Sequence, residues 1–443
     1  MSTSPFKVIV VGGGPVGILT AHALHQAGIE FIVLEQRSDI FEDVGASLIV
    51  SPHNLRVFHQ LGLWNHLEGI GYPLLHHSQG FDARKHRFRR SYTLSILQKN
   101  HGSSLIAFHR AELVKALYEN LPEDAKTRYL LGKKLTSAVA TSTGIDVVCA
   151  DGHSYSGSII IGADGAHSKT RSIMRCCALE SDPSLASVWD PEIPFTSAYK
   201  CLWASFRRPS EPGDSYETRG QDRSLMYLTG RDKGWLFLYE KLDQPSNQRC
   251  LYDKKAIQSF RDTFADWPLN EQLTVKDVLQ DPDVIEGMTN LEEGVVNKVS
   301  WNGRIVLVGD ARHKFTPNSG LGFNNGIQDV VSLCNKLRAL ICIEDKPDAA
   351  ALDTIFNNYQ AERCEPLRAD YLRSAHATRL STWATRMDYL LGRYIYSIPY
   401  IQRFLTAYYT SPKISQGLIL DYILASEPFL GKVLWKYPIK SSI

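Results

Sequence analysis

Three glycines near the N-terminus, Gly12, Gly14 and Gly17, constrain the fold of this chain more than any other feature. They follow an apolar, β-branched run at residues 6–11 and precede a helical pattern, after which a second apolar run covers residues 31–34. Strand, turn, helix and strand in this order form a βαβ unit, and its crossover requires the two strands to be parallel. The spacing G-x-G-x-x-G is typical of a turn that lets a pyrophosphate approach the backbone at a helix N-terminus. We therefore expect a parallel sheet that binds a dinucleotide.

Glu35 supports this interpretation of the glycine turn. It stands at the end of the second predicted strand, about 20 residues after the turn, where a carboxylate can bind the hydroxyls of an adenosine ribose. The alternative is that the glycines only make a tight turn, and the order of strand, turn, helix and acidic residue favours the nucleotide site.

Size and composition exclude several classes of protein. The chain has 443 residues, 44% hydrophobic and 22% charged, which suits a globular protein of two or three closely joined domains. A formal net charge of +2 gives no reason to expect a nucleic-acid partner. The eight cysteines are scattered without a C-x-x-C pair, so we expect reduced thiols and no metal site. A strand-like run close to Met1 leaves no room for a secretory signal, and we expect a cytoplasmic protein.

The order of the predicted elements gives an α/β fold class with four segments. Residues 1–175 form the first part of a Rossmann-like nucleotide-binding domain with an inserted β segment. Residues 176–297 are rich in aromatics and form a mostly antiparallel β-sheet for the substrate. Residues 298–375 return to the first domain and end in a long helical region from about residue 323. Residues 376–443 form an aromatic, helical C-terminal extension.

Two later motifs resemble those of a known family. Residues 162–171 contain Asp164 in a D-G segment, and residues 309–313 contain Asp310 in a G-D segment. The G-D segment is followed by four further matching positions, Pro317, Gly320, Gly322 and Asn324. With the N-terminal glycines, this set resembles the group A FAD-dependent monooxygenases, which have the para-hydroxybenzoate hydroxylase-like fold. The resemblance implies FAD as the bound cofactor.

The resemblance also assigns positions around the flavin. Asp310, at a strand end, would accept a hydrogen bond from a ribityl hydroxyl, and the glycines at 320 and 322 permit backbone approach to the flavin. Gly45 and Ser47 resemble the loop beside the flavin. Arg110 resembles the arginine of an R-x-x-L helix that reaches the polar side of the flavin, although a bare arginine is more often a surface ion-pair partner. For Asp164, a cofactor role and a role in fixing its own turn both stay open.

The reaction that the resemblance implies is oxygen transfer. NADPH or NADH would reduce FAD, O2 would add at the flavin C4a, and the hydroperoxide would hydroxylate or epoxidise a small lipophilic indole, terpenoid or phenol. The sequence looks like fungal natural-product monooxygenases and epoxidases. Because no second G-x-G-x-x-G is present, we expect the reductant to dock transiently. Tyr199, Trp235 and His313 are candidate catalytic residues, and each is at least as readily explained as a core or loop residue.

Alternatives of other classes stay open. A flavin-dependent halogenase of the same fold would carry W-x-W-x-I-P, from which residues 234–239 depart. An FAD oxidase or reductase, and a non-catalytic dinucleotide-sensing module, also share the nucleotide motif. The extension at 376–443 either packs on the catalytic domain, which we favour because Pro399 and Pro412 interrupt it, or makes peripheral contact with a membrane.

Overall fold

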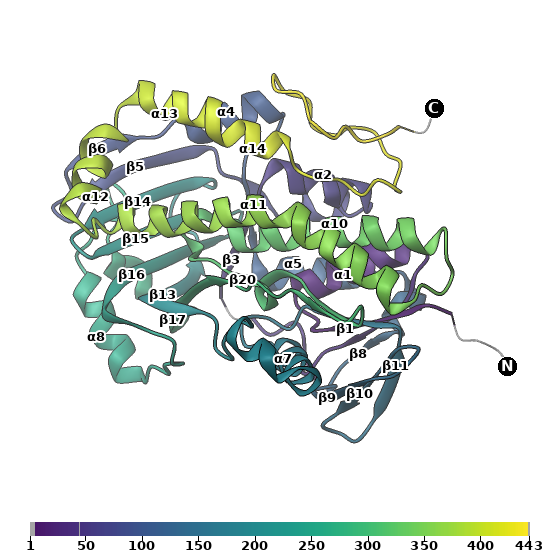
Figure 1. Ribbon diagram of the computed structural model, residues 1–443. Coiled ribbons are helices and arrows are strands. Elements are labelled where there is room, and N and C mark those ends of the chain that lie inside the picture. Colours follow the sequence, from purple (N-terminus) through teal and green to yellow (C-terminus); the bar gives the residue numbers. More distant parts are fainter. Residues whose placement is uncertain (1–4, 44, 442–443) are drawn as a thin grey trace.

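The N-terminal βαβ unit forms as predicted in the computed structural model, which describes residues 5–43 and 45–441 (Figure 1). Its strands β1 and β2 are parallel neighbours in the centre of a six-stranded sheet of order β18-β19-β12-β1-β2-β8. All neighbouring pairs in this sheet are parallel except β18 with β19. The strands are β1 (Lys7–Val11), β2 (Glu30–Leu34), β8 (Tyr129–Leu130), β12 (Ile159–Gly162), β18 (Ser300–Trp301) and β19 (Ile305–Leu307). The α/β fold class is confirmed.

Apolar side chains from the sheet and its helices form the main core. The strands β1, β2 and β12 are buried along most of their length, as expected for a parallel sheet covered by helices. α1 packs against α5 and α10, and Figure 1 shows α10 and α11 lying side by side across the molecule. The helices of this part are α1 (Pro15–Gln26), α2 (Pro52–Gln60), α3 (Trp64–Leu67), α5 (Arg110–Glu119), α6 (Glu123–Lys126), α7 (Lys169–Ser181), α10 (Leu321–Ile341) and α11 (Ala349–Ser381).

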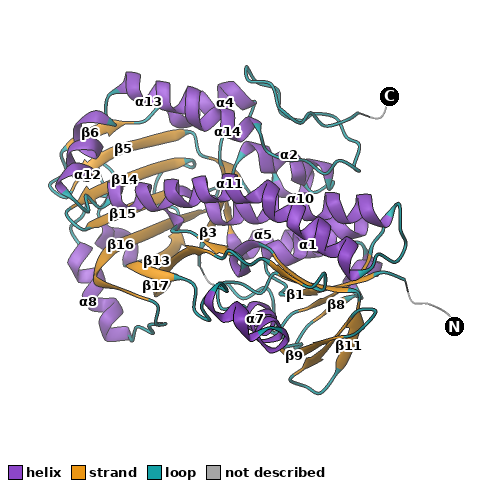
Figure 2. Ribbon diagram, in the orientation of Figure 1, coloured by secondary structure: helices purple, strands orange, loops and turns teal. Residues whose placement is uncertain are grey.

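An eight-stranded sheet forms the second layer, of order β20-β17-β13-β16-β15-β14-β5-β6 (Figure 2). It is antiparallel except where β14 pairs with β5, and α8 (Lys254–Phe264) and α9 (Val275–Leu279) pack against it. Its strands are β5 (His76–Asp82), β6 (Arg87–Arg90), β13 (Thr196–Arg207), β14 (Asp214–Gly220), β15 (Arg223–Thr229), β16 (Lys233–Ser246), β17 (Ile285–Val295) and β20 (His313–Lys314). The sheet therefore draws β5 and β6 from the segment that we assigned to the nucleotide-binding part, and β20 from the returning segment.

The remaining labelled strands form two three-stranded sheets. The sheet β3-β7-β4 joins β3 (Ser47–Val50), β4 (Tyr72–Pro73) and β7 (Ile106–His109). The sheet β11-β10-β9 joins β9 (Leu135–Ala140), β10 (Ile145–Cys149) and β11 (Ser154–Gly157), and is the β segment expected within residues 1–175.

The C-terminal half differs from the prediction in one respect. The single helical region expected from residue 323 to 375 is two helices, because α10 ends at Ile341 and α11 begins after Asp348. Pro347 interrupts the pattern, and the Asp348 carboxylate caps α11 by accepting from the Ala351 N–H at 2.8 Å.

Short helices follow α11 in the chain: α12 (Arg386–Leu390), α13 (Pro399–Leu405) and α14 (Ser411–Ser415). α13 and α14 pack against α4 (Thr93–His101), which comes from the first part of the chain. None of the described helices is long and apolar enough to cross a membrane.

Candidate active site

A cavity of about 870 Å³ opens between the two large sheets. Its wall combines the carboxyl ends of β1 and β2 with residues of β13, β15, β16 and β17, so both layers contribute. Ten of the predicted cofactor residues line it: Gly12, Gly14, Glu35, Ser47, Arg110, Asp164, Asp310, Pro317, Gly320 and Gly322. Residues predicted from five separate stretches of sequence therefore line one cavity.

The glycine turn shows three different requirements for glycine. Gly12 has φ +103°, and a Cβ there would lie 2.5 Å from the Ala163 carbonyl oxygen. A Cβ on Gly17 would lie 1.8 Å from the Gly12 carbonyl oxygen, so this glycine lets α1 pack against the turn, behind the cavity wall. A Cβ on Gly14 would meet no protein atom within 4 Å. Gly14 therefore leaves open the space in front of the α1 N-terminus, where no side chain caps the helix.

Glu35 closes one end of this space. Its buried carboxylate accepts hydrogen bonds from the Gly13 N–H at 2.6 Å, the Arg37 N–H at 2.8 Å and the Arg37 Nε–H at 2.9 Å. Burial alone would raise the pKa of Glu35, but the hydrogen bonds and charge of Arg37 outweigh it and lower the pKa. Glu35 is therefore an anion fixed beside the glycine turn, as ribose binding requires.

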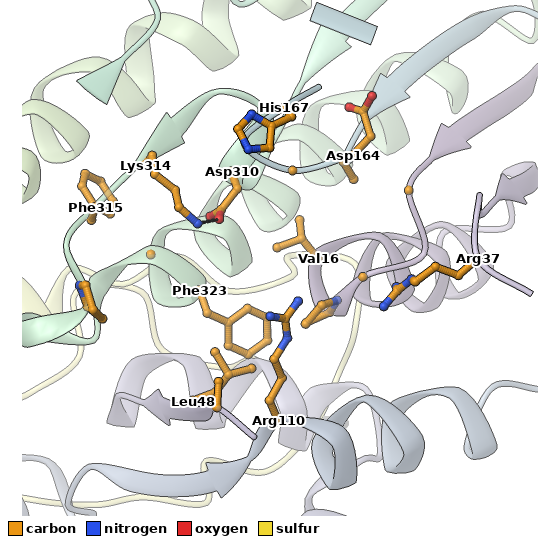
Figure 3. Close-up of a pocket in the computed structure, with 18 of the residues that line it drawn as sticks. Val16, Arg37, Leu48, Arg110, Asp164, His167, Asp310, Lys314, Phe315 and Phe323 are labelled. Atoms are coloured by element: carbon orange, nitrogen blue, oxygen red, sulfur yellow. Dashed lines mark hydrogen bonds and ion pairs between the residues drawn. The ribbon is translucent and has the colours of Figure 1, made fainter. Parts of the chain in front are cut away.

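A group of three charges lies at the other end of the cavity. Figure 3 shows Asp310 and Lys314 pointing toward one another, with an ion pair between Lys314 Nζ and Asp310 Oδ2, while Arg110 enters from the opposite wall. Burial would raise the pKa of Asp310, but the nearby charges of Lys314 and Arg110 hold it below its ordinary value. The Arg110 guanidinium makes no hydrogen bond or ion pair with the rest of the described chain. Its charge faces the cavity and interacts with the carboxylate of Asp310 through space, without direct contact.

The N-terminus of α10 borders the same end. Gly320 has φ +61°, which a residue with a side chain rarely adopts, and no side chain caps the helix. Gly322 is open toward Asp310, whose Oδ1 would lie 3.9 Å from a Cβ at this position. Asn324 does not line the cavity. It is buried behind the wall and donates to the carbonyl oxygens of Gly320 at 2.6 Å and Ile49 at 2.7 Å.

Asp164 lines the cavity and also fixes its own turn. It accepts from Ser168 Oγ at 2.5 Å and from the Thr170 N–H at 2.9 Å at the start of α7. Burial raises its pKa. Arg171, the third residue of α7, donates to the Ala311 carbonyl oxygen at 2.8 Å. This bond connects the D-G loop to the G-D loop.

Comparison with known proteins identifies this arrangement. A family model described as an FAD-binding domain matches residues 5–187 and 266–367. The FAD-dependent monooxygenase ausM of Penicillium brasilianum is 32% identical over 407 residues, which cover 89% of this chain and 83% of that protein. The FAD-dependent monooxygenase esdpE of Penicillium shearii is 31% identical, over 96% of this chain and 87% of that protein.

The chain is a member of the FAD-dependent monooxygenase family. Solved structures show the same fold. The monooxygenase aligns with Klebsiella pneumoniae HpxO, solved with FAD and uric acid, with a TM-score of 0.65 at 20% identity, covering 92% of this chain and 95% of that one. It aligns with 2,6-dihydroxypyridine-3-hydroxylase of Arthrobacter nicotinovorans with a TM-score of 0.66 at 18% identity, covering 87% and 95%. The para-hydroxybenzoate hydroxylase-like fold is thereby confirmed.

The cavity of the monooxygenase fits FAD. The open space at Gly14 and the uncapped N-terminus of α1 suit a pyrophosphate, and the fixed anion Glu35 suits a ribose. At the other end, the carboxylate of Asp310 is available to accept from a hydroxyl, because Lys314 is the one described residue that donates to it.

The part of the cavity formed by β13, β15, β16 and β17, with Phe315 just after β20, is apolar. Its lining side chains are Cys201, Trp203, Met226, Leu228, Phe237, Leu291 and Phe315. Two glycines leave room for the Trp203 ring, because a Cβ on Gly287 would lie 2.2 Å from it and a Cβ on Gly45 would lie 2.7 Å from it. Gly45 therefore supports the wall of this apolar half without lining it.

The three candidate catalytic residues do not line the cavity. Tyr199 is buried farther along β13, where its hydroxyl accepts from Oγ1 of Thr382, the residue after α11, at 3.2 Å. Trp235 is buried on β16 and donates from Nε1 to His109 Nδ1 at 3.2 Å. His313 lies behind the G-D loop, 2.9 Å from the buried carboxylate of Asp329. Each of the three residues has a structural partner. For Tyr199 and Trp235, the alternation of side chains along a strand predicts the face of the sheet but not how far along the strand the cavity extends.

Two cavity features escaped sequence analysis. Lys314 comes directly after the G-D segment at residues 309–313, and its spacing of four residues from Asp310 was the available signal. His109 bonds Asp43 Oδ2 at 2.8 Å, and Asp43 in turn accepts from the Gly45 N–H at 2.7 Å, which fixes the loop before Ser47. Nothing in the sequence pattern pairs these two residues.

Proposed function

We propose that this monooxygenase takes electrons from NADPH or NADH and inserts one oxygen atom of O2 into a small lipophilic secondary metabolite. The observation that carries the proposal is the apolar half of the cavity, where Trp203, Phe237 and Phe315 offer a surface for a hydrocarbon skeleton. Bound FAD would supply the redox chemistry and the activation of oxygen. The side chains of the apolar half would orient the substrate and keep water away from the reacting atoms.

The apolar half also bears on the kind of oxygen insertion. Of the described residues lining this part, Cys201 is the one with an ionisable side chain, and burial raises the pKa of its thiol well above the ordinary value. A thiol in this state does not act as a base near neutral pH. This favours insertion into a carbon–carbon double bond or an electron-rich indole over a phenol that must first lose its proton.

Two lysines support NADPH as the reductant. Lys134 and Lys169 line the cavity beside the D-G loop, are exposed, and form no ion pair with any described residue. The neighbouring Lys133, by contrast, is neutralised by Asp151 Oδ2 at 2.5 Å. Unpaired cations at a nucleotide cavity attract phosphate, and the 2′-phosphate is the anionic group that distinguishes NADPH from NADH.

A surface on the short C-terminal helices supports peripheral membrane contact as a second proposal. The side chains of Tyr400 and Tyr408 are 76% and 69% exposed, and Phe404 between them is 44% exposed. Exposed Arg403 and Lys413 lie on the same segment. An apolar, aromatic and basic surface suits the interface of an anionic bilayer. Sedimentation with vesicles containing phosphatidylserine should carry down the protein, and Phe404→Asp should release it. Equal recovery with and without vesicles would reject this contact.

The main proposal is tested by following the flavin and the oxygen. Anaerobic addition of NADPH to the purified holoenzyme should bleach the flavin absorbance, and oxygen with a panel of prenylated indoles, terpenoids and phenols should restore it. Labelled oxygen gas should place one heavy oxygen atom in the product. Hydrogen peroxide with an unlabelled, dehydrogenated product would indicate an oxidase instead, and a chlorinated or brominated product would indicate a halogenase.

A further inference from the structure

Residues 417–441, which we name the C-terminal strap, run back across the FAD-binding part without forming a helix or strand. Figure 1 shows this segment beside α2, far from the helices α12 and α13 that precede it in the chain. Several side chains of the nucleotide-binding part anchor it. The anchors include Arg56 to Glu427 at 2.7 Å, Asn335 to the Ile419 carbonyl oxygen at 2.8 Å, and Tyr422 to the Ala23 carbonyl oxygen at 2.8 Å.

Two glutamines hold the strap in the same manner. Gln60 of α2 accepts from the Leu420 N–H at 3.0 Å and donates to the carbonyl oxygens of Leu420 at 2.7 Å and Ile423 at 2.9 Å. Gln328 of α10 accepts from the Leu418 N–H at 2.7 Å and donates to the Leu418 carbonyl oxygen at 3.2 Å. Each side-chain amide thus pairs with both backbone polar groups of one strap residue, Gln60 bonds Ile423 in addition, and both glutamines are buried.

The hydrogen bonds of Gln328 continue to the cavity wall, unlike those of Gln60. Gln328 Nε2 donates to Asn54 Oδ1 at 2.8 Å, and Asn54 Nδ2 donates to Asn324 Oδ1 at 2.7 Å. Asn324 then holds the carbonyl oxygens of Gly320 and Ile49, which both line the cavity. This chain of buried amides connects the strap to the N-terminus of α10.

We infer that the strap is part of the FAD site and that Gln328 is a positioning residue, which sets the cofactor affinity through Asn54 and Asn324. Without the Gln328 donor, the Asn54 carbonyl oxygen is buried and unpaired, so the amide turns to find a partner and its bond to Asn324 is lost. Asn324 Oδ1 then keeps the Ser51 N–H at 2.9 Å as its donor, and the weaker restraint on Asn324 loosens Gly320 and Ile49 at the cavity. The inference rests on FAD binding in this cavity and does not depend on the substrate or the reductant.

The matched test compares Gln328→Leu with Gln60→Leu. Gln60→Leu removes three hydrogen bonds to the strap and Gln328→Leu removes two, and both replace a buried amide by an apolar group of similar size. The readouts are the FAD dissociation constant of the apoprotein, from quenching of flavin fluorescence, and the visible circular dichroism of the bound flavin. Gln328→Leu should raise the dissociation constant about tenfold or more and change the visible spectrum, because a network of buried hydrogen bonds is lost. Gln60→Leu should leave both readouts close to those of the unmodified protein.

A second variant, Gln328→Glu, tests the inference if Gln328→Leu does not fold. Gln328→Glu keeps an acceptor for the Leu418 N–H and removes the donor to Asn54, so it should weaken FAD binding in the same direction. Equal changes in FAD affinity for the variants at 60 and 328, or no change for either, would overturn the inference. Because both readouts are taken without substrate, a protein that binds FAD in this manner but transfers no oxygen would reject the proposed function and leave the inference standing.

Discussion

Alanine substitutions at Gly14 and Gly17 should separate cofactor binding from folding within one motif. Gly14 has φ −73° and ψ −176°, which any residue adopts, and a Cβ there meets no protein atom within 4 Å. Loss of the preferred glycine at a helix N-cap costs about 0.5–1 kcal/mol, and the smaller entropy of the unfolded chain offsets about 0.4–1 kcal/mol. Gly14→Ala should therefore change the free energy of unfolding of the apoprotein by less than about 1 kcal/mol.

The same methyl group would occupy the space where the pyrophosphate approaches the α1 N-terminus. Loss of one charge-assisted hydrogen bond costs about 1.5–3 kcal/mol, which raises the FAD dissociation constant about 10–150-fold. In Gly17→Ala, the new Cβ would lie 1.8 Å from the Gly12 carbonyl oxygen, so α1 must move. Overpacking of this kind should lower the free energy of unfolding by about 1–3 kcal/mol or more.

Urea unfolding of the two apoproteins, followed by circular dichroism, and FAD titration, followed by fluorescence quenching, check both values. Gly14→Ala with normal FAD affinity would show that the pyrophosphate does not approach this turn. Gly14→Ala as unstable as Gly17→Ala would refute the assignment of open space at Gly14.

Three further outcomes are expected. Asp310→Ala should weaken FAD binding by about 1.5–3 kcal/mol, the scale of a charge-assisted hydrogen bond, and a full flavin content after gel filtration would contradict this. Lys134→Ala and Lys169→Ala should each reduce the ratio of kcat/KM for NADPH over NADH about tenfold, as loss of a charge-assisted bond predicts, while Lys133→Ala leaves it unchanged. An unchanged ratio in both would assign these lysines to another role. Burial of His22 lowers its pKa from 6.5 to about 4, so the unfolded chain binds the proton first and stability falls as the pH drops from about 6.5 toward 4. Between pH 7 and 5 the free energy of unfolding, measured by urea titration, should fall by about 2 kcal/mol through His22. The pH dependence of stability should be smaller in His22→Gln, and an undiminished dependence would contradict this.

Local patterns predicted the nucleotide end of the site well. The turn at Gly12 and the acidic residue at 35 belong to one continuous βαβ unit, whose geometry follows from strand and helix periods alone. The G-D motif also brought Asp310 and Gly320 to the cavity, because both follow a buried parallel strand at the carboxyl edge of the sheet.

The remaining parts of the fold and of the site depend on contacts between residues far apart in sequence, which local patterns do not predict. β5 joins the eight-stranded sheet by a parallel pairing with β14, and no local signal specifies a partner so distant in sequence. On β13, alternation placed Tyr199 on the same side as the cavity residues Cys201 and Trp203, but α11 covers the strand at Tyr199. A period of two residues gives the face of a strand and not the length of strand that a cavity occupies.

The anchoring of the C-terminal strap to α1, α2 and α10 has a consequence for biosynthesis. β1 and α1 leave the ribosome early, whereas the partners that complete their surroundings, β19, α10 and the strap, are synthesised much later. Domains fold as units once their sequence is available, so the nascent chain exposes an unfinished sheet through most of translation. The inferred role of the strap in FAD binding then predicts that cofactor loading follows synthesis of the strap, and that premature termination before it yields a protein without flavin.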